Sequence, residues 1–303
     1  MSNIVVVGSI SMDLVMETSR IALEGETVFG DAFSMVPGGK GANQAVALGR
    51  LSHGNDCVSM IGAVGNDSFG PILVDNLKKN AVAVDCVGTV PESSGIAQIT
   101  LFNQDNRIIV FPGANALVNT GGWTKEWEII KTCDLVILQN EIPHEVNLQI
   151  ASYCHDHKIR VLYNPAPARS SDLEMIDYVT YFTPNEGECK ELFPDKTIEE
   201  ALKSFPNKLI VTLGSKGSTY YDGKQIQMIP AIKTQAVDTT GAGDTFNGAF
   251  GFALSNDLAI ADALRFATLA SHLSVQKFGA QGGMPTLDEM KGHEAYEEKW
   301  NLK

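Results

Sequence analysis

The sequence predicts an α/β fold with a doubly wound, mainly parallel central sheet and a small β-sheet lid inserted from two hairpins. Short apolar runs, typical of strands buried on both faces, alternate along the chain with segments of helical periodicity. This alternation indicates parallel strands joined by right-handed helical crossovers. Polar residues and glycines follow the apolar runs directly, as they do where ligands bind in open α/β sheets. We expect a single domain over residues 1–303.

The first strand is expected at Ile4–Val7, an apolar run that ends at Gly8. A dinucleotide-binding fold requires G-x-G-x-x-G after this strand, and only Gly8 is present, so the sequence argues against a Rossmann site. Asp13 follows shortly, close to where ligands collect at the carboxyl end of a first parallel strand. A turn-forming Asp explains this residue equally well.

Two predicted hairpins interrupt the alternation. Alternating segments at Leu14–Glu17 and Thr27–Met35 flank a Glu-Gly-Glu turn, and Ile96–Phe102 and Arg107–Phe111 flank a polar turn at Asn103–Asn106. The two hairpins are expected to join in one small sheet.

This small sheet is a candidate lid, because a hairpin inserted after the first strand of an α/β domain can cover a binding site. Its expected limits are about residues 14–37 and 93–112. The apolar face of such a sheet needs cover, either from closure over a substrate or from a partner subunit.

A glycine-rich segment, Pro37–Ala45, leads into a helix that is expected to end near Leu51. It is not a P-loop, because Lys40 is followed by glycine rather than Ser or Thr. Bare backbone here, with the side chains of Lys40 and Asn43, suits hydrogen bonding to a small polyhydroxylated ligand. The alternative is a flexible turn with a solvated lysine.

The alternation then continues toward the C-terminus. Further strands are expected at Cys57–Ala63, Asp134–Leu138, Ile159–Tyr163, Tyr178–Thr183 and Lys208–Leu213, and helices at Phe69–Asn80 and His144–His157. Because parallel strands end at one edge of a sheet, four residues near strand ends are expected to line that edge together. They are Asp13, Glu141, Asn185 and Gly214.

Asn185 and Glu188 lie three residues apart after Pro184, at a predicted helix start, and therefore share a face of that helix. An amide and a carboxylate in this arrangement suit magnesium bound through water beside phosphates. A helix-start Asn with an acidic first turn explains the pair equally well.

The stretch Asp238–Gly248 reads DTTGAGDTFNG and precedes a helix that starts near Gly241–Asp244. The free N–H groups of a first helical turn bind anions, and glycines let a substrate approach them. We interpret Asp244 as a base that takes a hydroxyl proton while these amides stabilise charge on a transferring group. The alternative, a helix-capping Asp, leaves the preceding Gly-Ala-Gly unexplained.

Composition limits the partners. The formal charge of −13 argues against nucleic acid and anionic membranes. The five cysteines contain no C-x-x-C pair, which favours free thiols in a reducing cytoplasm. Neither a signal segment nor an apolar run of membrane-spanning length is present, so a cytoplasmic protein is expected.

Two segments about two hundred residues apart, GGKGANQA at 38–45 and DTTGAGDTFNG at 238–248, resemble the signatures of the ribokinase (PfkB) family of carbohydrate kinases. Further segments fit in order: Gly8–Ile10 with Asp13, Glu141, Asn164–Pro167, Asn185 with Glu188, and Thr212–Gly217. The likeness is greatest to the ribose-phosphorylating members. It implies ATP-dependent phosphorylation of D-ribose at the 5-hydroxyl, giving ribose 5-phosphate and ADP. Alternatives are another sugar or nucleoside kinase of this family, or a non-catalytic sugar or nucleotide sensor.

The resemblance implies a role for each matching residue. Asp244 would be the base, and the amides of Gly241, Ala242 and Gly243 would form the anion hole. The sugar would be held by Ser11, Asp13, Gly39, Lys40, Gly41, Asn43, Glu141 and Asp244. ATP would contact Asn185, Thr212, Gly214, Ser215, Gly217, Gly243 and Thr268.

The resemblance also implies metal ions and a partner subunit. Glu188 would organise magnesium through water, and potassium or a similar monovalent cation would act as activator. The ligands of that cation would be Asp238, Thr240, Ser274, Lys277, Gly279 and Gly283. The lid would form the interface of a homodimer.

Three positions depart from the family pattern. Ser11 stands where Asn is usual, and Thr268 replaces a longer polar side chain beside the adenine. Gly283 falls where a serine often assists the monovalent cation, so we expect an altered potassium dependence.

Overall fold

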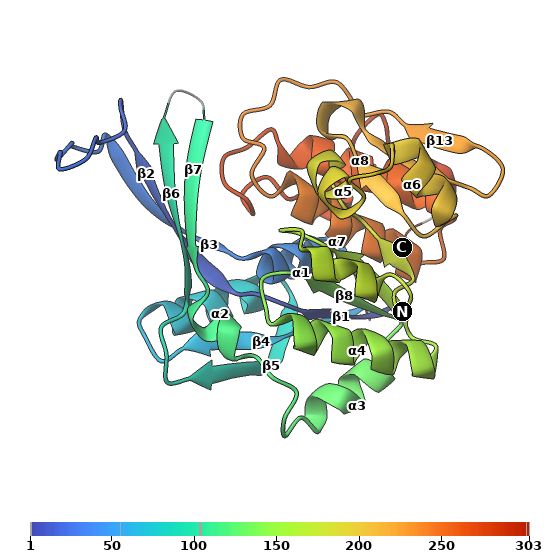
Figure 1. Cartoon of the computed structure of the whole chain (residues 1–303), viewed down its shortest axis with the longest axis horizontal. Coiled ribbons are helices and arrows are strands. Elements are labelled where there is room, and N and C mark those ends of the chain that lie inside the picture. The colour runs from blue at the N-terminus through green and yellow to red at the C-terminus, as the bar shows by residue number, and fades with distance from the viewer. Residues whose placement is uncertain (1, 55, 103–104, 301, 303) are drawn as a thin grey trace.

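Six parallel strands form the central sheet of the computed structural model, which describes residues 2–54, 56–102, 105–300 and 302. In spatial order they are β10 (Tyr181–Phe182), β9 (Arg160–Asn164), β8 (Leu135–Gln139), β1 (Asn3–Val7), β4 (Cys57–Gly65) and β5 (Val82–Val90) (Figure 1). The chain winds outward from β1 in both directions, which confirms the predicted doubly wound sheet. The sequence reading did not include β5, and it made β10 too long.

Helices cover both faces of this sheet because successive side chains of a strand point to opposite sides. Ile4 and Val6 of β1 pack in one hydrophobic core, and Val5 and Val7 pack in the other. The first core contains residues of α1 (Lys40–Leu51), α2 (Phe69–Lys79), α7 (Ala242–Ser255), α8 (Ile260–Ser274) and α9 (Leu287–Lys291). The second contains residues of α3 (Lys125–Lys131), α4 (His144–His157), α5 (Glu186–Leu192) and α6 (Ile198–Ser204).

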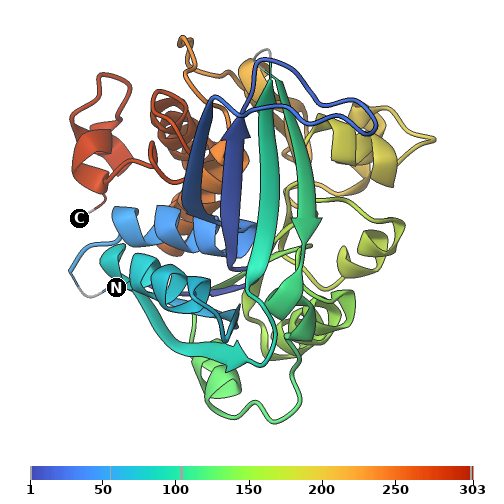
Figure 2. The same cartoon turned by 90° about the vertical axis from the view of Figure 1, so that its left-hand side faces the viewer.

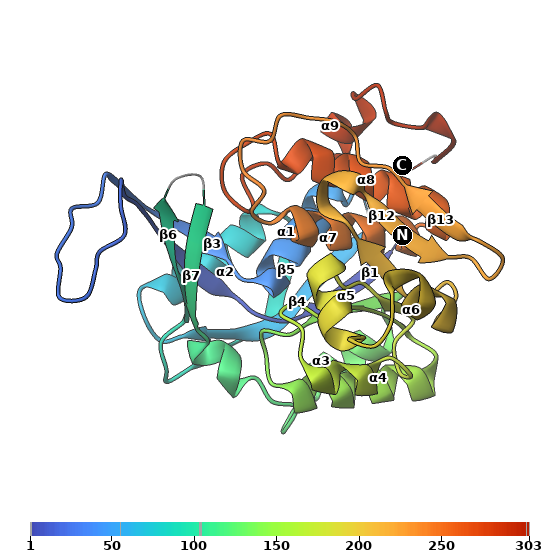
Figure 3. The same ribbon diagram turned by 45° about the horizontal axis from the view of Figure 1, so that its top comes forward.

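The helices α1 and α7, which carry the two family signatures, pack directly against each other. Helix α7 also packs against α8, so it lies between the two (Figure 3). Four short 3-10 helices complete the helical elements of the described residues: Gly113–Leu117, Ser170–Met175, Gly214–Lys216 and Glu298–Trp300. This packing brings two segments that lie about two hundred residues apart in sequence into one site.

The strand predicted at Lys208–Leu213 differs from its prediction. It is shorter, as β11 (Ile210–Thr212), and it forms a three-stranded antiparallel sheet with β12 (Ser218–Tyr221) and β13 (Ile226–Ile229). Two isolated parallel bridges, Phe182 with Leu209 and Asn185 with Thr212, connect it to the end of the central sheet. Beyond β10, the strands β11, β12 and β13 therefore pair antiparallel instead of continuing the parallel sheet.

A separate four-stranded sheet stands beside the α/β body, in the order β3 (Ala32–Gly38), β2 (Ser11–Glu17), β6 (Gly95–Phe102), β7 (Asp105–Phe111) (Figure 2). The two predicted hairpins therefore join in one sheet, through a parallel pairing of β2 with β6. Residues Thr27–Asp31, predicted as strand, lie outside β3, and part of the predicted turn at Asn103–Asn106, residues 103–104, falls outside the described residues. Many apolar side chains of this sheet are exposed, including Phe33 (56%) and Ile109 (69%).

Within the described part of the chain, none of the helices combines the length and the hydropathy needed to span a bilayer.

Candidate active site

The N-terminus of α7 presents the glycine turn. Gly241 is the N-cap residue in the left-handed region (φ 73°), and a Cβ there would lie 2.5 Å from the Ala280 carbonyl oxygen. The Ala242 amide donates to the Thr239 carbonyl at 3.2 Å, whereas the amides of Gly241 and Gly243 have no acceptor among the described residues. Of the three predicted anion-hole donors, two are therefore open to a ligand.

Asp244 lies in the first turn of α7 but does not cap it. Its carboxylate is 6% exposed and accepts two side-chain hydrogen bonds from α1: Asn43 Nδ2 to Oδ2 at 2.9 Å, and Gln44 Nε2 to Oδ1 at 3.1 Å. Burial raises the pKa of Asp244, while Lys40 and the two amide donors oppose this shift. The helix-capping alternative is therefore wrong.

Charged groups from three other segments surround this carboxylate. Glu141 follows β8, and its Oε2 accepts from the Ser9 hydroxyl at 2.5 Å and from the Lys40 amide at 2.9 Å. Burial, together with the charges of Glu141 and Asp244, raises the pKa of Asp13 to about 7. Burial lowers the pKa of Lys40, but the nearby carboxylates, Asp244 foremost, outweigh burial and raise it. Asp13, Lys40, Glu141 and Asp244 thus form one polar cluster. Glu141 follows a parallel strand as predicted, whereas Asp13 lies within β2 of the four-stranded sheet rather than at the end of β1.

The glycines of the 38–41 segment have a packing role that the sequence did not indicate. A Cβ at Gly38 would overlap the carboxylate of Asp13, and one at Gly39, where φ is 88°, would lie 2.9 Å from the Ser11 amide. A Cβ at Gly41 would lie 2.6 Å from the Ser9 amide. Glycine is needed at 39 and 41 because the start of α1 touches the backbone of residues 8–11, and at 38 because the Asp13 carboxylate packs on the end of β3.

A cavity of about 640 Å³ opens beside α7. Its lining includes every residue predicted to bind ATP except Asn185: Thr212, Gly214, Ser215, Gly217, Gly243 and Thr268. Asn185 lies next to it, paired with Thr212 in a parallel bridge. The lining also includes Ile232, Phe246, Ser271 and His272, which the sequence reading did not assign to ATP because they come from three separate segments: the loop after β13, α7 and α8.

Gly243 and Asp244 connect the cavity to the polar cluster. Gly243 lines the cavity, and a Cβ added to it would meet no described heavy atom within 4 Å. The next residue, Asp244, faces the cluster of Asp13, Lys40 and Glu141. Two adjacent residues of one helical turn thus face the cavity and the polar cluster, respectively.

Asn185 and Glu188 form a reciprocal capping box at the start of α5. Asn185 Oδ1 accepts from the Glu188 amide at 2.9 Å, and Glu188 Oε2 accepts from the Asn185 amide at 2.8 Å. Burial raises the pKa of Glu188, and Lys40 opposes this shift. The helix-start alternative therefore describes the geometry, and it leaves the second oxygen of Glu188 available for a ligand.

Asp238 connects the two loops predicted to hold a monovalent cation. Its Oδ1 accepts from the Thr240 amide and its Oδ2 from the Gly279 amide, both at 2.9 Å. Any side chain at Gly283 would overlap the Ser274 carbonyl, so position 283 can offer only backbone. Lys277 directs its ammonium toward Glu289, at 3.5 Å, which leaves only its carbonyl for a cation. The described residues contain no group of three or more His, Cys, Asp or Glu placed to hold a metal.

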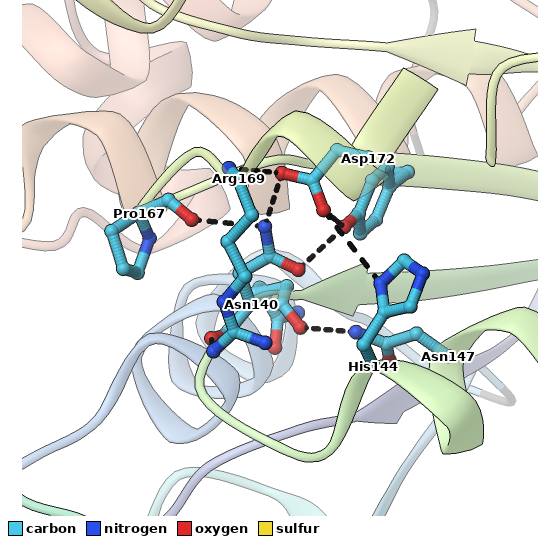
Figure 4. Close-up of polar contacts among 8 residues, drawn as sticks. Asn140, His144, Asn147, Pro167, Arg169 and Asp172 are labelled. Atoms are coloured by element: carbon cyan, nitrogen blue, oxygen red, sulfur yellow. Dashed lines mark hydrogen bonds and ion pairs between the residues drawn. The ribbon is translucent and has the colours of Figure 1, made fainter. Parts of the chain in front are cut away.

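A second buried network supports the turn that carries Glu141. Asp172 is fully buried and accepts from the Tyr163 hydroxyl (2.8 Å), Asn140 Nδ2 (2.6 Å) and the Arg169 amide (2.7 Å) (Figure 4). Arg169 Nη2 in turn donates to the Asn140 carbonyl at 2.7 Å. Since Glu141 follows Asn140, this network fixes the end of β8 where the polar cluster begins.

Asn115 was also missed, although its contacts hold a predicted site residue. Its Oδ1 accepts from the Ile10 amide at 2.9 Å, and its Nδ2 donates to the Ser11 hydroxyl at 3.1 Å. Ser11 is thereby buried against Asn115. No signal in the sequence pairs these two residues.

Known proteins are similar to this chain in both sequence and architecture. A model described as pfkB family carbohydrate kinase matches residues 1–287. The chain is 62% identical over 291 residues to a ribokinase of Lactococcus lactis, with 96% of each protein covered. A solved ribokinase of Thermotoga maritima has a TM-score of 0.88 at 35% identity, covering 96% of this chain and 99% of that one. A ribokinase of Arabidopsis thaliana, solved in complex with ribose and ATP, has a TM-score of 0.87 at 32% identity, covering 96% of this chain and 98% of that one.

These structures confirm the expected ribokinase-like α/β fold, and the matches extend over nearly the whole chain. The chain belongs to the PfkB family of carbohydrate kinases.

Proposed function

We propose that this protein transfers the γ-phosphoryl group of ATP to the 5-hydroxyl of D-ribose, giving ribose 5-phosphate and ADP. One observation carries the proposal: Gly243 opens onto a cavity of about 640 Å³, while its neighbour Asp244 faces a buried polar cluster. A nucleotide in the cavity would place its phosphates at the start of α7, beside a carboxylate that can take a proton. The proposal that the sugar is ribose rests on the similarity to the ribokinases named above.

Asp244 would take the proton of the 5-hydroxyl, and the open amides of Gly241 and Gly243 would hold charge on the migrating phosphoryl group. Phosphoryl transfer depends on positioning and charge stabilisation more than on covalent chemistry. The buried Asp244 carboxylate and the N–H groups of a helix start meet this need, since both are fixed before substrate arrives. The Ala242 amide, already bonded to Thr239, would contribute only if that bond opened.

The sugar would lie among the polar groups around Asp244. Asp13 and Glu141 would accept hydrogen bonds from ribose hydroxyls, and Lys40 and Asn43 would donate them. The backbone of Gly39 and Gly41 and the hydroxyl of Ser11 would border this space. The Ser11 hydroxyl already accepts a hydrogen bond from Asn115, so we assign Ser11 the weakest of these roles.

Magnesium would accompany ATP, held by the phosphates and, through water, by Glu188. One carboxylate with a free oxygen suits this ion, which keeps several waters and relies on substrate phosphates. When bound, magnesium would neutralise charge on the β- and γ-phosphates. Asn185, beside Thr212 at the edge of the cavity, would contact the nucleotide.

A monovalent cation such as potassium would bind at the Asp238 loops, next to Gly241. We expect Asp238→Ala to abolish stimulation of turnover by potassium, because this variant loses both the ligand and its bonds to Thr240 and Gly279. ADP release measured over a potassium series checks this. Asp195→Ala, a change of an exposed carboxylate elsewhere, serves as control. An unchanged potassium response in Asp238→Ala would remove this site.

The four-stranded sheet, from about residues 14–37 and 93–112, would act as a lid and as the contact of a homodimer. Exposed apolar side chains on it, among them Phe33, Met35, Ile109 and Phe111, need cover. We further place the protein in the cytoplasm, because all five cysteines are free. The net charge of −13 disfavours nucleic acid and membrane partners.

The function is tested by measuring ADP release with ribose, deoxyribose, fructose and adenosine, each with and without potassium. We expect the highest kcat/KM with ribose, because the Asp13, Lys40 and Glu141 cluster offers both donors and acceptors to several hydroxyls. A higher value with fructose or adenosine would identify another kinase of the family. ATP binding without turnover of any of the four would favour a sensor.

A further inference from the structure

The carboxylate of Asp244 is held by two consecutive side chains of α1. Asn43 donates to one of its oxygens at 2.9 Å and Gln44 to the other at 3.1 Å. Gln44 is fully buried, and its amide contacts the carboxylate of the base. None of the roles proposed above uses Gln44.

The direction of the Gln44 amide is set by a chain of bonds that ends on a backbone carbonyl. The Thr183 carbonyl can only accept, and Asn164 Nδ2 donates to it at 3.0 Å. Asn164 Oδ1 must then accept, which it does from Gln44 Nε2 at 3.2 Å. Gln44 Oε1 accepts in turn from Gln139 Nε2 at 2.7 Å. Both Gln44 N–H groups are therefore directed at Asn164 and Asp244, and its oxygen is kept away from the carboxylate.

The Asn43 amide is oriented in a similar way. Its Oδ1 accepts from Gln281 Nε2 at 2.9 Å, and Gln281 Oε1 accepts from Asn76 Nδ2 at 2.8 Å. Two rows of buried amides thus meet at Asp244, and each presents an N–H to it. Hydrogen bonds of this kind restrict side-chain rotation. Among the described residues Gln139 Oε1, at the end of the first row, has no hydrogen-bond partner, whereas the amides of Gln44 and Asn43 are bonded at both their oxygen and their nitrogen.

Resting on the proposed function, we propose that Gln44 is a positioning residue: with its orientation set by Gln139 and Asn164, it fixes the Asp244 carboxylate toward the sugar hydroxyl and keeps it ionised. Donors on both oxygens leave the carboxylate one favoured orientation and stabilise its charged form. The other charged groups facing Asp244 are Lys40, which favours ionisation, and Glu141 and Asp13, which oppose it. When all four groups are ionised, the cluster carries two more negative than positive charges, and neutral donors such as Gln44 help to keep the base in its active form.

Gln44→Met tests this proposal, because methionine preserves volume and removes the donor. A base whose pKa rises needs a higher pH to become active, so the acid limb of the kcat–pH profile should move upward by about one pH unit. Turnover should then fall more at low pH than at high pH, while KM for ATP stays unchanged. Asn147→Leu is the control: this buried amide donates to the Gln139 carbonyl at 2.7 Å and does not reach Asp244. It should lower the melting temperature and leave the pH profile in place.

A readout without substrate separates this proposal from the proposed function. In protein carrying ¹³C at the aspartate carboxyl carbon, the resonance absent from Asp244→Asn belongs to Asp244, and its titration should move upward in Gln44→Met. If Gln44→Met fails to fold, Gln139→Met takes its place, since it leaves Gln44 and its bond to Asn164 present but removes the donor to its oxygen; a smaller shift in the same direction is expected. Wild-type titration midpoints in the variant would overturn the role of Gln44. Absence of ribose turnover in the wild type would overturn the proposed function alone.

Discussion

Asp244→Asn is expected to bind ribose and ATP while turnover falls by about two orders of magnitude or more, as when a positioned base is lost. Asparagine has nearly the same shape, so it should fill the same buried position, where its oxygen can still accept from Asn43 or Gln44 while its own N–H group faces the other donor. It cannot take the hydroxyl proton. Isothermal titration of both ligands and ADP release at saturation check the two parts of this expectation.

The stability of the same variant relative to the wild type should be highest near neutral pH. Burial raises the pKa of Asp244 in the folded protein above its unfolded value, so the ionised carboxylate destabilises the fold at neutral pH. This penalty decreases as the pH falls toward the unfolded pKa, and the advantage of asparagine should decrease with it. Thermal melts at several pH values measure the difference. Near-normal turnover in a stable Asp244→Asn would remove Asp244 from its role as base.

Gly243→Val is expected to fold normally and to lose about a hundredfold in kcat/KM for ATP, in the range found when an anion-stabilising donor is lost. The added side chain would meet no described heavy atom within 4 Å, because it would enter the cavity where phosphate must approach. Valine also fits a helix better than glycine does, so the melting temperature should not fall.

Two further variants, one at the same glycine and one at another glycine of α7, serve as controls for this expectation. Gly243→Ala should give a smaller loss, because one methyl group leaves more room for phosphate. Gly248→Val lies on the same helix, but its Cβ would lie 2.8 Å from the Ala47 Cβ, so it should lower the melting temperature. Unchanged kinetics in a folded Gly243→Val would contradict a phosphate site at the start of α7.

The sequence predicted those parts of the site that depend on local pattern. The glycine turn before α7 and the segment before α1 follow from composition and helix periodicity, and Glu141 follows from strand ends meeting at one edge. Asp13 was predicted near the site, but it reaches it from β2 of the four-stranded sheet rather than from the end of β1. The antiparallel pairing of β11 with β12 was not predicted, because strands of only three and four residues carry little periodic signal. The requirement for glycine at 38 and 41 was not predicted either, because it depends on contacts with residues 8–13 that only the folded chain brings together.

The contacts of Gln44 were beyond sequence reasoning for a different reason. Gln44 lies within GGKGANQA, directly after Asn43, so it is part of a segment that the sequence reading had already singled out. Its partners Asp244, Asn164 and Gln139 are 200, 120 and 95 residues away, and the direction of an amide depends on all of them at once. Pattern locates such a residue, but only the assembled fold assigns its hydrogen bonds.

Asp13 belongs to β2, and therefore to the four-stranded sheet rather than to the α/β body. Gly38, on the neighbouring strand β3, packs directly on its carboxylate. A rotation of that sheet as a rigid unit would withdraw Asp13, while Asp244 stayed behind on α7. The acceptor subsite would then exist only in the closed arrangement, so a protein tethered open should retain nucleotide and release sugar.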